Sequence, residues 1–125
     1  MDGIKTAEVL KKGDLFYTSW GYDQTNYDYI VVLEVSKTGK TAKCQRTAHL
    51  NMGHESQCDV QEPIFCPFGE IFTMQVRRYD WSPDELRLKG SYPFLHTGIG
   101  DKRLDSFSRA KIGQQFHQTD AYSGH

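Results

Sequence analysis

The chain has no long hydrophobic run, because no stretch approaches the ~20 consecutive apolar residues that a membrane-spanning helix requires. Its first residues, M-D-G-I-K-T-A-E, lack the apolar segment of a secretory signal. Neither charge sign is in excess: the net charge is −1, so no overall basic field attracts nucleic acid or an anionic membrane. These absences predict a cytoplasmic protein without a membrane contact, and they leave nucleic-acid binding to a local basic face.

Cysteine is scarce, and its three copies, an odd number, indicate a reducing compartment rather than a disulfide framework. No C-x-x-C knuckle is present, although zinc sites usually contain such a pair among their four N or S ligands. One cluster has the spacing C-x4-H-x4-H-x3-C-x7-C and consists of Cys44, His49, His54, Cys58 and Cys66. It either binds a metal or combines a packed cysteine with loop histidines. Because half of a usual zinc site is missing, we expect neither a metal nor another cofactor.

Motifs for catalysis are absent as well. The sequence contains neither a G-x-x-x-x-G-K-[ST] phosphate loop nor a G-x-S-x-G nucleophile turn. Paired carboxylates can hold Mg²⁺, so Asp23, Asp28 and Asp120 could converge as the site of a small metal-dependent hydrolase. Asp side chains also cap the local backbone routinely, which explains each of them without catalysis. A binding protein is therefore favoured over an enzyme, and no catalytic residue is assigned.

Aromatic residues are abundant, at 13 % of the chain, whereas the hydrophobic content of 38 % is low. A core that is poor in aliphatic side chains but rich in Tyr and Phe fits a half-buried sheet better than a helix bundle. The clearest strand runs from Tyr27 to Ser36, and Lys37-Thr38-Gly39-Lys40 predicts a hairpin turn into a strand over 41–47. Alternation predicts further strands over 15–19 and 71–79.

The remaining segments show weaker patterns. Residues 49–70 predict a loop-rich insertion, Ser82-Pro83 predicts the start of a short helix before Gly90, and 104–118 predicts a final hairpin about Gly113. No repeat or linker divides the chain, so one domain is expected over residues 1–125. The predicted fold class is mainly β: a small antiparallel barrel or strongly bent sheet, SH3-like at the N-terminal strands, with one short helix.

One stretch, Ser19 to Tyr29, mixes aromatic and hydrogen-bonding side chains in the order S-W-G-Y-D-Q-T-N-Y-D-Y. A plain turn between strands needs only one or two residues such as Gly21 and Asn26, yet three more hydrogen-bonding side chains lie between the aromatic ones. They either cap the backbone of a broad loop or face a ligand.

This stretch also carries a resemblance. The motif S-W-G-Y-D-Q-T-N, followed by Asp28-Tyr29 and an apolar strand, resembles a group of short proteins from bacteriophages and other mobile elements. The tail is similar too, in its basic-aromatic segment around Gly113 and in Phe116-His117-Gln118-Thr119-Asp120. The similarity covers about the first 50 and the last 20 residues. It implies a phage provenance, hence the host cytoplasm, and a shared site, but no particular reaction.

Three classes of function follow from these observations. The first is a non-enzymatic phage-type binding module that contacts nucleic acid or a nucleic-acid-processing complex, with basic residues that neutralise phosphates and aromatic residues that stack on bases. The alternatives are a protein-interaction or anti-defence factor that blocks a host complex, and the small hydrolase. Besides the basic-aromatic segment around Gly113, the sequence contains another one, in which Arg77 and Arg78 precede Tyr79 and Trp81. The predicted ligand-binding residues are Trp20, Tyr22, Asp23, Gln24, Asn26, Asp28, Arg109, Lys111 and Asp120.

Overall fold

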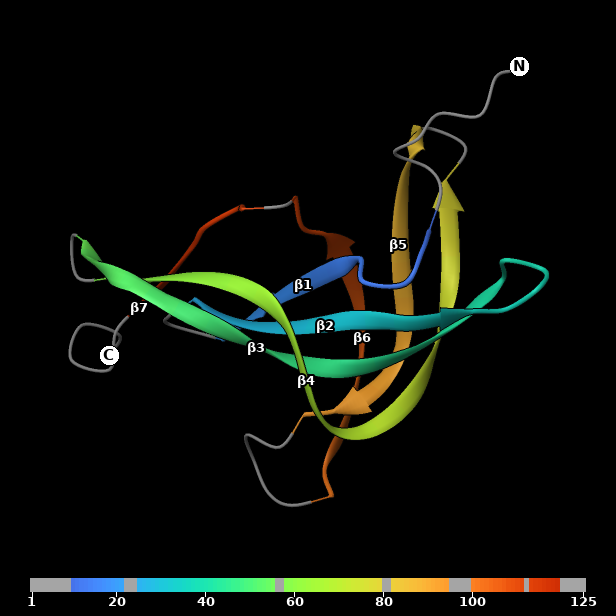
Figure 1. The fold of residues 1–125 in the computed structure, drawn as a ribbon, viewed down its shortest axis with the longest axis horizontal. Coiled ribbons are helices and arrows are strands. Elements are labelled where there is room, and N and C mark those ends of the chain that lie inside the picture. Colours follow the sequence, from blue (N-terminus) through green and yellow to red (C-terminus); the bar gives the residue numbers. More distant parts are fainter. Residues whose placement is uncertain are drawn as a thin grey trace.

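The protein is described by a computed structural model, which places residues 10–21, 25–55, 58–79, 82–94, 100–111 and 113–119 (Figure 1). These residues form seven strands and no helix. The strands are β1 (Leu15–Trp20), β2 (Asn26–Val35), β3 (Thr41–Glu55), β4 (Cys58–Tyr79), β5 (Ser82–Pro93), β6 (Lys102–Arg109) and β7 (Phe116–Thr119).

Strands β1 to β6 close into an antiparallel barrel, and β7 is an extra strand outside it. Neighbours along the chain pair in order from β1 to β6, and β6 returns to pair with β1 at Phe16 and Tyr17. The pairing of β3 with β4 runs far past the barrel, where β7 covers the other edge of β4 between Cys58 and Gln61. The prediction of a small antiparallel β barrel is confirmed.

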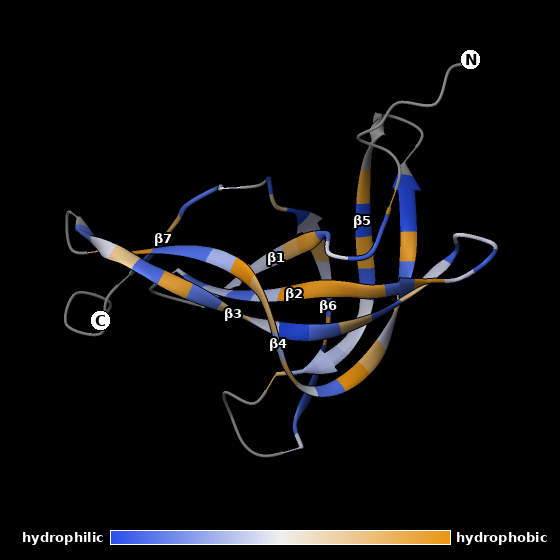
Figure 2. Cartoon of the chain, in the orientation of Figure 1, coloured by the Kyte–Doolittle hydropathy of each residue, from blue (hydrophilic) through white to orange (hydrophobic). Residues whose placement is uncertain are grey.

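The barrel interior is the main core, because alternate side chains of every barrel strand point into it. Figure 2 shows this alternation as apolar and polar segments that follow one another along the strands. The most enclosed side chains include three aromatic rings, which agrees with a core poor in aliphatic residues. The interior residues are Phe16, Ile30, Val32, Ala42, Cys44, Phe72, Met74, Leu86, Leu88, Tyr92, Phe94 and Phe107.

A second, smaller cluster lies on the outer face of β1 and β2, where the chain returns after β6. Phe116 of β7 packs against Tyr17 and Tyr27 at ring-centroid distances of 4.5 and 5.1 Å, and it lies 5.4 Å from Tyr29. Ala110 completes the buried part of this cluster. The aromatic residues of β2 therefore hold the last strand in place, next to the stretch that the sequence singles out.

The prediction of a short helix after Ser82-Pro83 is wrong, because residues 82–93 form strand β5. Leu86 and Leu88 alternate into the core, and β5 pairs with β4 on one side and β6 on the other. Two partners complete the backbone hydrogen bonds of this segment, so tertiary pairing overrides the local capping signal. Gly90 allows the close packing of β5 against β4, because a Cβ at this position would lie 2.8 Å from the Met74 sulfur.

Two other connections also differ from expectation. Residues 49–70, expected as a loop-rich insertion, are mostly paired in the long β3–β4 hairpin, whose register shifts at three bulges. These bulges interrupt the alternation that a sequence pattern needs. The expected final hairpin does not form either, since β6 pairs with β1 and β5 whereas β7 pairs with β4.

The packing predicts unequal reactivity of the three thiols. Cys44 is fully buried in the core, and burial raises the pKa of its thiol to about 12, whereas Cys66 is exposed and Cys58 is half-buried. We expect a thiol-alkylating reagent to modify Cys66 first, Cys58 more slowly, and Cys44 only after denaturant is added. Mass spectrometry of the digested protein measures the three rates, and rapid alkylation of Cys44 in the native protein would contradict this fold.

Candidate functional site

One end of the barrel gathers basic side chains from several elements. Arg77 of β4 lies directly opposite Arg87 of β5, and Arg87 in turn pairs with Ser108, next to Arg109 at the end of β6. This register places two guanidinium groups on directly opposed positions of neighbouring strands. We call this group the basic end; it consists of Lys11, Lys12, Arg77, Arg78, Arg87 and Arg109.

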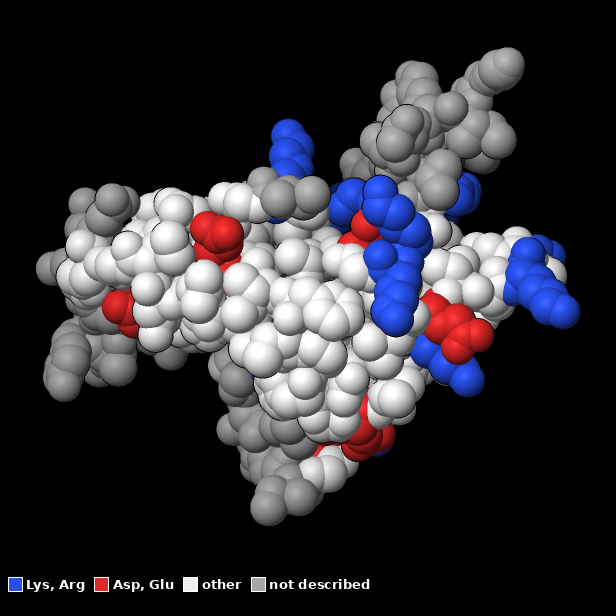
Figure 3. All heavy atoms as spheres, viewed as in Figure 1, with Lys and Arg blue, Asp and Glu red and all other residues white. Residues whose placement is uncertain are grey.

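The carboxylate of Asp14, in the turn before β1, contacts the basic end. Asp14 accepts from Arg109 Nη1 at 2.9 Å and from the Lys11 backbone N–H at 3.0 Å, while the Lys11 and Lys12 side chains are exposed. Lys and Arg side chains gather over β5 and the turn that precedes β1 (Figure 3). Among the described residues, basic side chains are therefore gathered locally on a chain whose net charge is −1.

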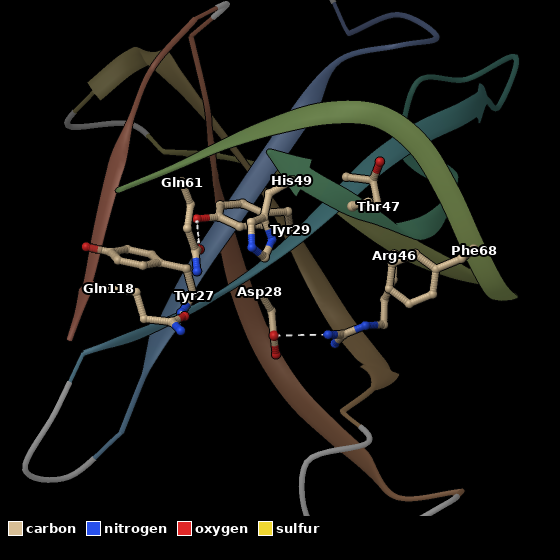
Figure 4. Close-up of a pocket in the computed structure, with 10 residues that line it drawn as sticks. Tyr27, Asp28, Tyr29, Arg46, Thr47, His49, Gln61, Phe68 and Gln118 are labelled. Carbon is tan, nitrogen blue, oxygen red and sulfur yellow. Dashed lines mark hydrogen bonds and ion pairs between the residues drawn. The ribbon is translucent and has the colours of Figure 1, made fainter. Parts of the chain in front are cut away.

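The second candidate site is a pocket where β2 and β3 separate. Their ladder ends at Ile30 and Arg46, so β2 before Ile30 and β3 after Arg46 diverge. The gap between them opens into a pocket of about 340 Å³ (Figure 4). Side chains on both faces of β2 line the pocket, and residues of β4 and β7 complete its wall. Its lining residues are Tyr27, Asp28, Tyr29, Arg46, Thr47, Ala48, His49, Gln61, Phe68 and Gln118.

A buried ion pair forms one side of the pocket. Arg46 Nη2 lies 3.1 Å from Asp28 Oδ1, and the Tyr92 hydroxyl donates to Asp28 Oδ2 at 2.7 Å. The Asp28 side chain is 1 % exposed and that of Arg46 is 11 % exposed. Because an isolated buried charge is costly, the two side chains depend on one another.

Arg46 is fixed by further contacts. Its Nη1 donates to the carbonyl oxygens of Pro93 and Phe94 at 3.1 and 3.4 Å, and its guanidinium lies 5.8 Å from the ring centres of Phe68 and Tyr92. The buried Nε–H has no acceptor among the protein atoms that the structure describes. One donor of an otherwise satisfied guanidinium is therefore left over beside the pocket.

Gln61 and Gln118 line the side of the pocket that lies opposite the ion pair (Figure 4). The Tyr29 hydroxyl donates to Gln61 Oε1 at 2.7 Å, and the Tyr27 backbone N–H donates to Gln118 Oε1 at 3.2 Å. Each amide oxygen is thus engaged, which fixes the orientation of the side chain and leaves its NH₂ group as a donor. Burial, with smaller contributions from the charges of Tyr27 and Asp28, raises the pKa of Tyr29 well above its usual range, so its hydroxyl remains a donor.

His49 lies at the rim, where its ring meets Tyr29 edge-on at 5.5 Å. Partial burial lowers the pKa of His49, although a hydrogen bond with Asn51 acts in the opposite direction. The neutral imidazole is therefore the favoured form in the folded protein.

This lowered pKa predicts an acid-side loss of stability. Below about pH 6.5 the unfolded chain protonates His49 before the folded chain does, so the free energy of unfolding falls as pH decreases and levels off below the folded-state pKa. We expect His49→Gln to flatten the profile in this window. Urea unfolding between pH 7.5 and pH 5 measures it, and an unchanged slope in the variant would contradict the assignment.

The residues predicted from the sequence divide into four groups. Asp28 lines the pocket, but both of its oxygens already accept hydrogen bonds. Trp20 packs edge-on against Phe94 at 5.0 Å, beside the core, and Asn26 is half-buried at the start of β2. Arg109 is paired with Asp14, and Lys111 is exposed on the connection to β7. Tyr22, Asp23, Gln24 and Asp120 lie outside the described residues.

The structure joins the two segments that carry the sequence resemblance. Tyr27 and Gln118 are 91 residues apart in the chain, yet they share a hydrogen bond in the pocket wall. Sequence analysis missed Arg46, Gln61 and Phe68, which come from the middle of the chain. A single Arg within an alternating strand gives no signal of burial, so only the fold identifies it.

The Cys/His cluster shows no metal arrangement in the part of the chain that is described, since no group of three His, Cys, Asp or Glu side chains converges there. Cys44 lies inside the barrel, whereas His54 Nδ1 lies 3.1 Å from Asp59 on the far part of the β3–β4 hairpin. Cys44 and His54 therefore lie in different environments.

Comparisons with known proteins give no match: no protein family, no curated protein and no solved structure is similar to this chain. Within the described residues, no helix is long and apolar enough to cross a bilayer.

Proposed function

We propose that this protein is a non-enzymatic binding module, of the kind that bacteriophages encode, and that its ligand is nucleic acid. The basic end is the observation that carries this proposal. It collects Lys and Arg side chains from four separate parts of the chain, with Asp14 as the carboxylate described among them. Phosphate contacts from such side chains supply most of the sequence-independent affinity for nucleic acid.

The opposed pair of Arg77 and Arg87 adds to this argument. The two guanidinium groups stand on directly opposed residues of β4 and β5, so one phosphate could contact both of them. Ser108 continues the row of Arg77 and Arg87 on β6, and a hydroxyl group can also donate to a phosphate oxygen. This row therefore combines charge with a further hydrogen-bond donor.

The hydrolase alternative receives less support. Its Asp28 is buried and bonded to Arg46 and Tyr92, which leaves little capacity to hold Mg²⁺. The protein-interaction alternative has one observation in its favour: several apolar side chains of the β3–β4 hairpin are about half exposed, namely Leu50, Met52, Phe65, Phe68 and Ile71. It is the second candidate function.

A titration of labelled oligonucleotides distinguishes the two candidates. Fluorescence anisotropy is measured with single- and double-stranded oligonucleotides at about 50 mM and 200 mM salt. For nucleic-acid binding we expect saturable binding that weakens steeply with salt, by roughly tenfold or more if several phosphates are contacted. A flat titration with the folded protein at the lower salt would contradict the proposal and favour a protein partner.

A further inference from the structure

We propose that the pocket between β2 and β3 binds a single nucleobase that carries ring carbonyl oxygens, as uracil, thymine and guanine do. The pocket volume of about 340 Å³ is near the lower end of small-molecule sites, which span roughly 300–1,000 Å³. It suits one base or nucleoside and is too small for a longer piece of chain. The hydrogen-bond donors of the pocket, its charge balance and its aromatic rings all favour such a ligand.

The pocket presents hydrogen-bond donors whose acceptor atoms are already used. Gln61 and Gln118 each commit Oε1 to a tyrosine, so their NH₂ groups remain to donate. In Figure 4 Gln61 and Gln118 lie on one side of Asp28 and Arg46 on the other, and all four residues line the pocket. Arg46 Nε–H is enclosed by protein atoms, so the two amide NH₂ groups are the donors that a ligand in the pocket would reach. A ligand that supplies acceptors gains hydrogen bonds from both amides.

The charge of the pocket favours a neutral ligand. The positive charge of Arg46 is balanced by Asp28 at 3.1 Å, and the glutamines are uncharged. A phosphate brought into this space would meet the buried Asp28 carboxylate, whereas a ring carbonyl would accept hydrogen bonds without adding charge. The basic end, not the pocket, is therefore the place for phosphates.

Aromatic rings supply a surface on which a base can stack. Phe68 borders the pocket, is 44 % exposed and lies against the Arg46 guanidinium. Tyr27 lies across the gap from it in Figure 4. Stacking of a base on an aromatic side chain is sequence-tolerant and strong, so Phe68 provides affinity while the amide donors select carbonyl-bearing bases.

The base has two possible sources that share this chemistry: a free nucleoside, or an unstacked base of a single strand. The second source rests on the proposed function, because the strand would also contact the basic end of the same barrel. Free nucleoside binding requires only the pocket, so the two claims can fail separately.

Two substitutions test the pocket with little risk to the fold. Phe68→Ala removes an exposed ring, and Gln118→Glu keeps an oxygen for the Tyr27 N–H while it replaces the donor with an acceptor. Phe65→Ala is the matched control, since Phe65 is an exposed phenylalanine of the same strand that does not line the pocket. The probes are uridine, adenosine and an oligothymidylate, each titrated into the ¹⁵N-labelled full chain.

We expect uridine or the oligothymidylate to shift the backbone amides of the pocket residues in a saturable way. Phe68→Ala and Gln118→Glu should each weaken this binding about tenfold or more, and Phe65→Ala should leave it unchanged. Adenosine should bind at least about tenfold more weakly than uridine, because adenine has no ring carbonyl.

If only the oligothymidylate shifts the pocket amides, with the same dependence on the variants, the strand is the source of the base and the proposal stands. The proposal is overturned if neither probe shifts these amides, if both pocket variants bind like the unsubstituted protein, or if adenosine binds as tightly as uridine. Oligonucleotide binding confined to the basic end would overturn the pocket assignment while the proposed function stands.

Discussion

Replacement of Asp28 with alanine is expected to lower the free energy of unfolding by about 3–5 kcal/mol, the range for loss of one partner of a buried ion pair. The variant would leave the Arg46 guanidinium, which is 11 % exposed, without its carboxylate, and the Tyr92 hydroxyl without its acceptor. Urea unfolding at neutral pH, followed by circular dichroism, measures the change.

Asp59→Ala is the matched control, because it also removes a carboxylate that contacts a basic side chain, here His54 Nδ1 at 3.1 Å, but at a site where Asp59 is 46 % exposed. We expect it to cost less than about 1 kcal/mol. Tyr92→Phe should fall between the two, at about 1–3 kcal/mol, since it removes one hydrogen bond from a buried carboxylate. Similar small losses in Asp28→Ala and Asp59→Ala would show that Asp28 is not the buried centre described here.

The double substitution of Lys12 and Arg77 with glutamine is expected to weaken oligonucleotide binding roughly 100-fold at low salt. Each charged contact with a phosphate is worth about 1.5 kcal/mol, or about tenfold in affinity. Both side chains are exposed, so the fold should be preserved. The slope of log affinity against log salt should also fall by about 2 in magnitude, one for each lost contact.

Lys43→Gln with Lys102→Gln is the control, since it removes the same charge from exposed positions outside the basic end. Lys43 lies opposite Thr73, four residues before Arg77 in β4, and Lys102 begins β6, at the opposite end of that strand from Arg109. Anisotropy titrations compare the two double variants under identical conditions. Equal weakening by both would indicate a general effect of net charge and would contradict a localised surface.

Much of the fold follows from patterns that sequence alone reveals. The alternation in 27–36 and the turn at Gly39 predict strand β2 and its hairpin with β3, and the aromatic content predicts a barrel-like sheet. The helix after Ser82 was predicted because Ser-Pro-Asp-Glu fits a helix start locally. Pairing with both neighbours decides otherwise, and no local signal reports it. With a helix expected after Ser82, the sequence does not indicate that Arg77 lies opposite Arg87. That register follows only from residues 82–93 forming a strand.

The candidate site was partly predictable. Trp20 to Tyr29 and the tail at Gln118 are the segments that the sequence indicates, and the structure brings Tyr27 and Gln118 together. Asp28 was expected to face a ligand, whereas it is buried against Arg46 and Tyr92. Arg46 is 18 positions from Asp28 in the chain and Tyr92 is 64 positions from it, so the ion pair and the hydrogen bond depend on tertiary contacts and no spacing in the sequence predicts them.

The central claim, that nucleic acid binds at the basic end, is tested most directly by lysine footprinting of the unsubstituted protein. The amines are acetylated with and without a saturating oligothymidylate at low salt, and each site is quantified by mass spectrometry. We predict that Lys11 and Lys12 become protected several-fold, while the exposed Lys43 and the Glu70-paired Lys102 react as before. Equal reactivity at all four lysines, or protection at Lys43 and Lys102 instead, would contradict the claim.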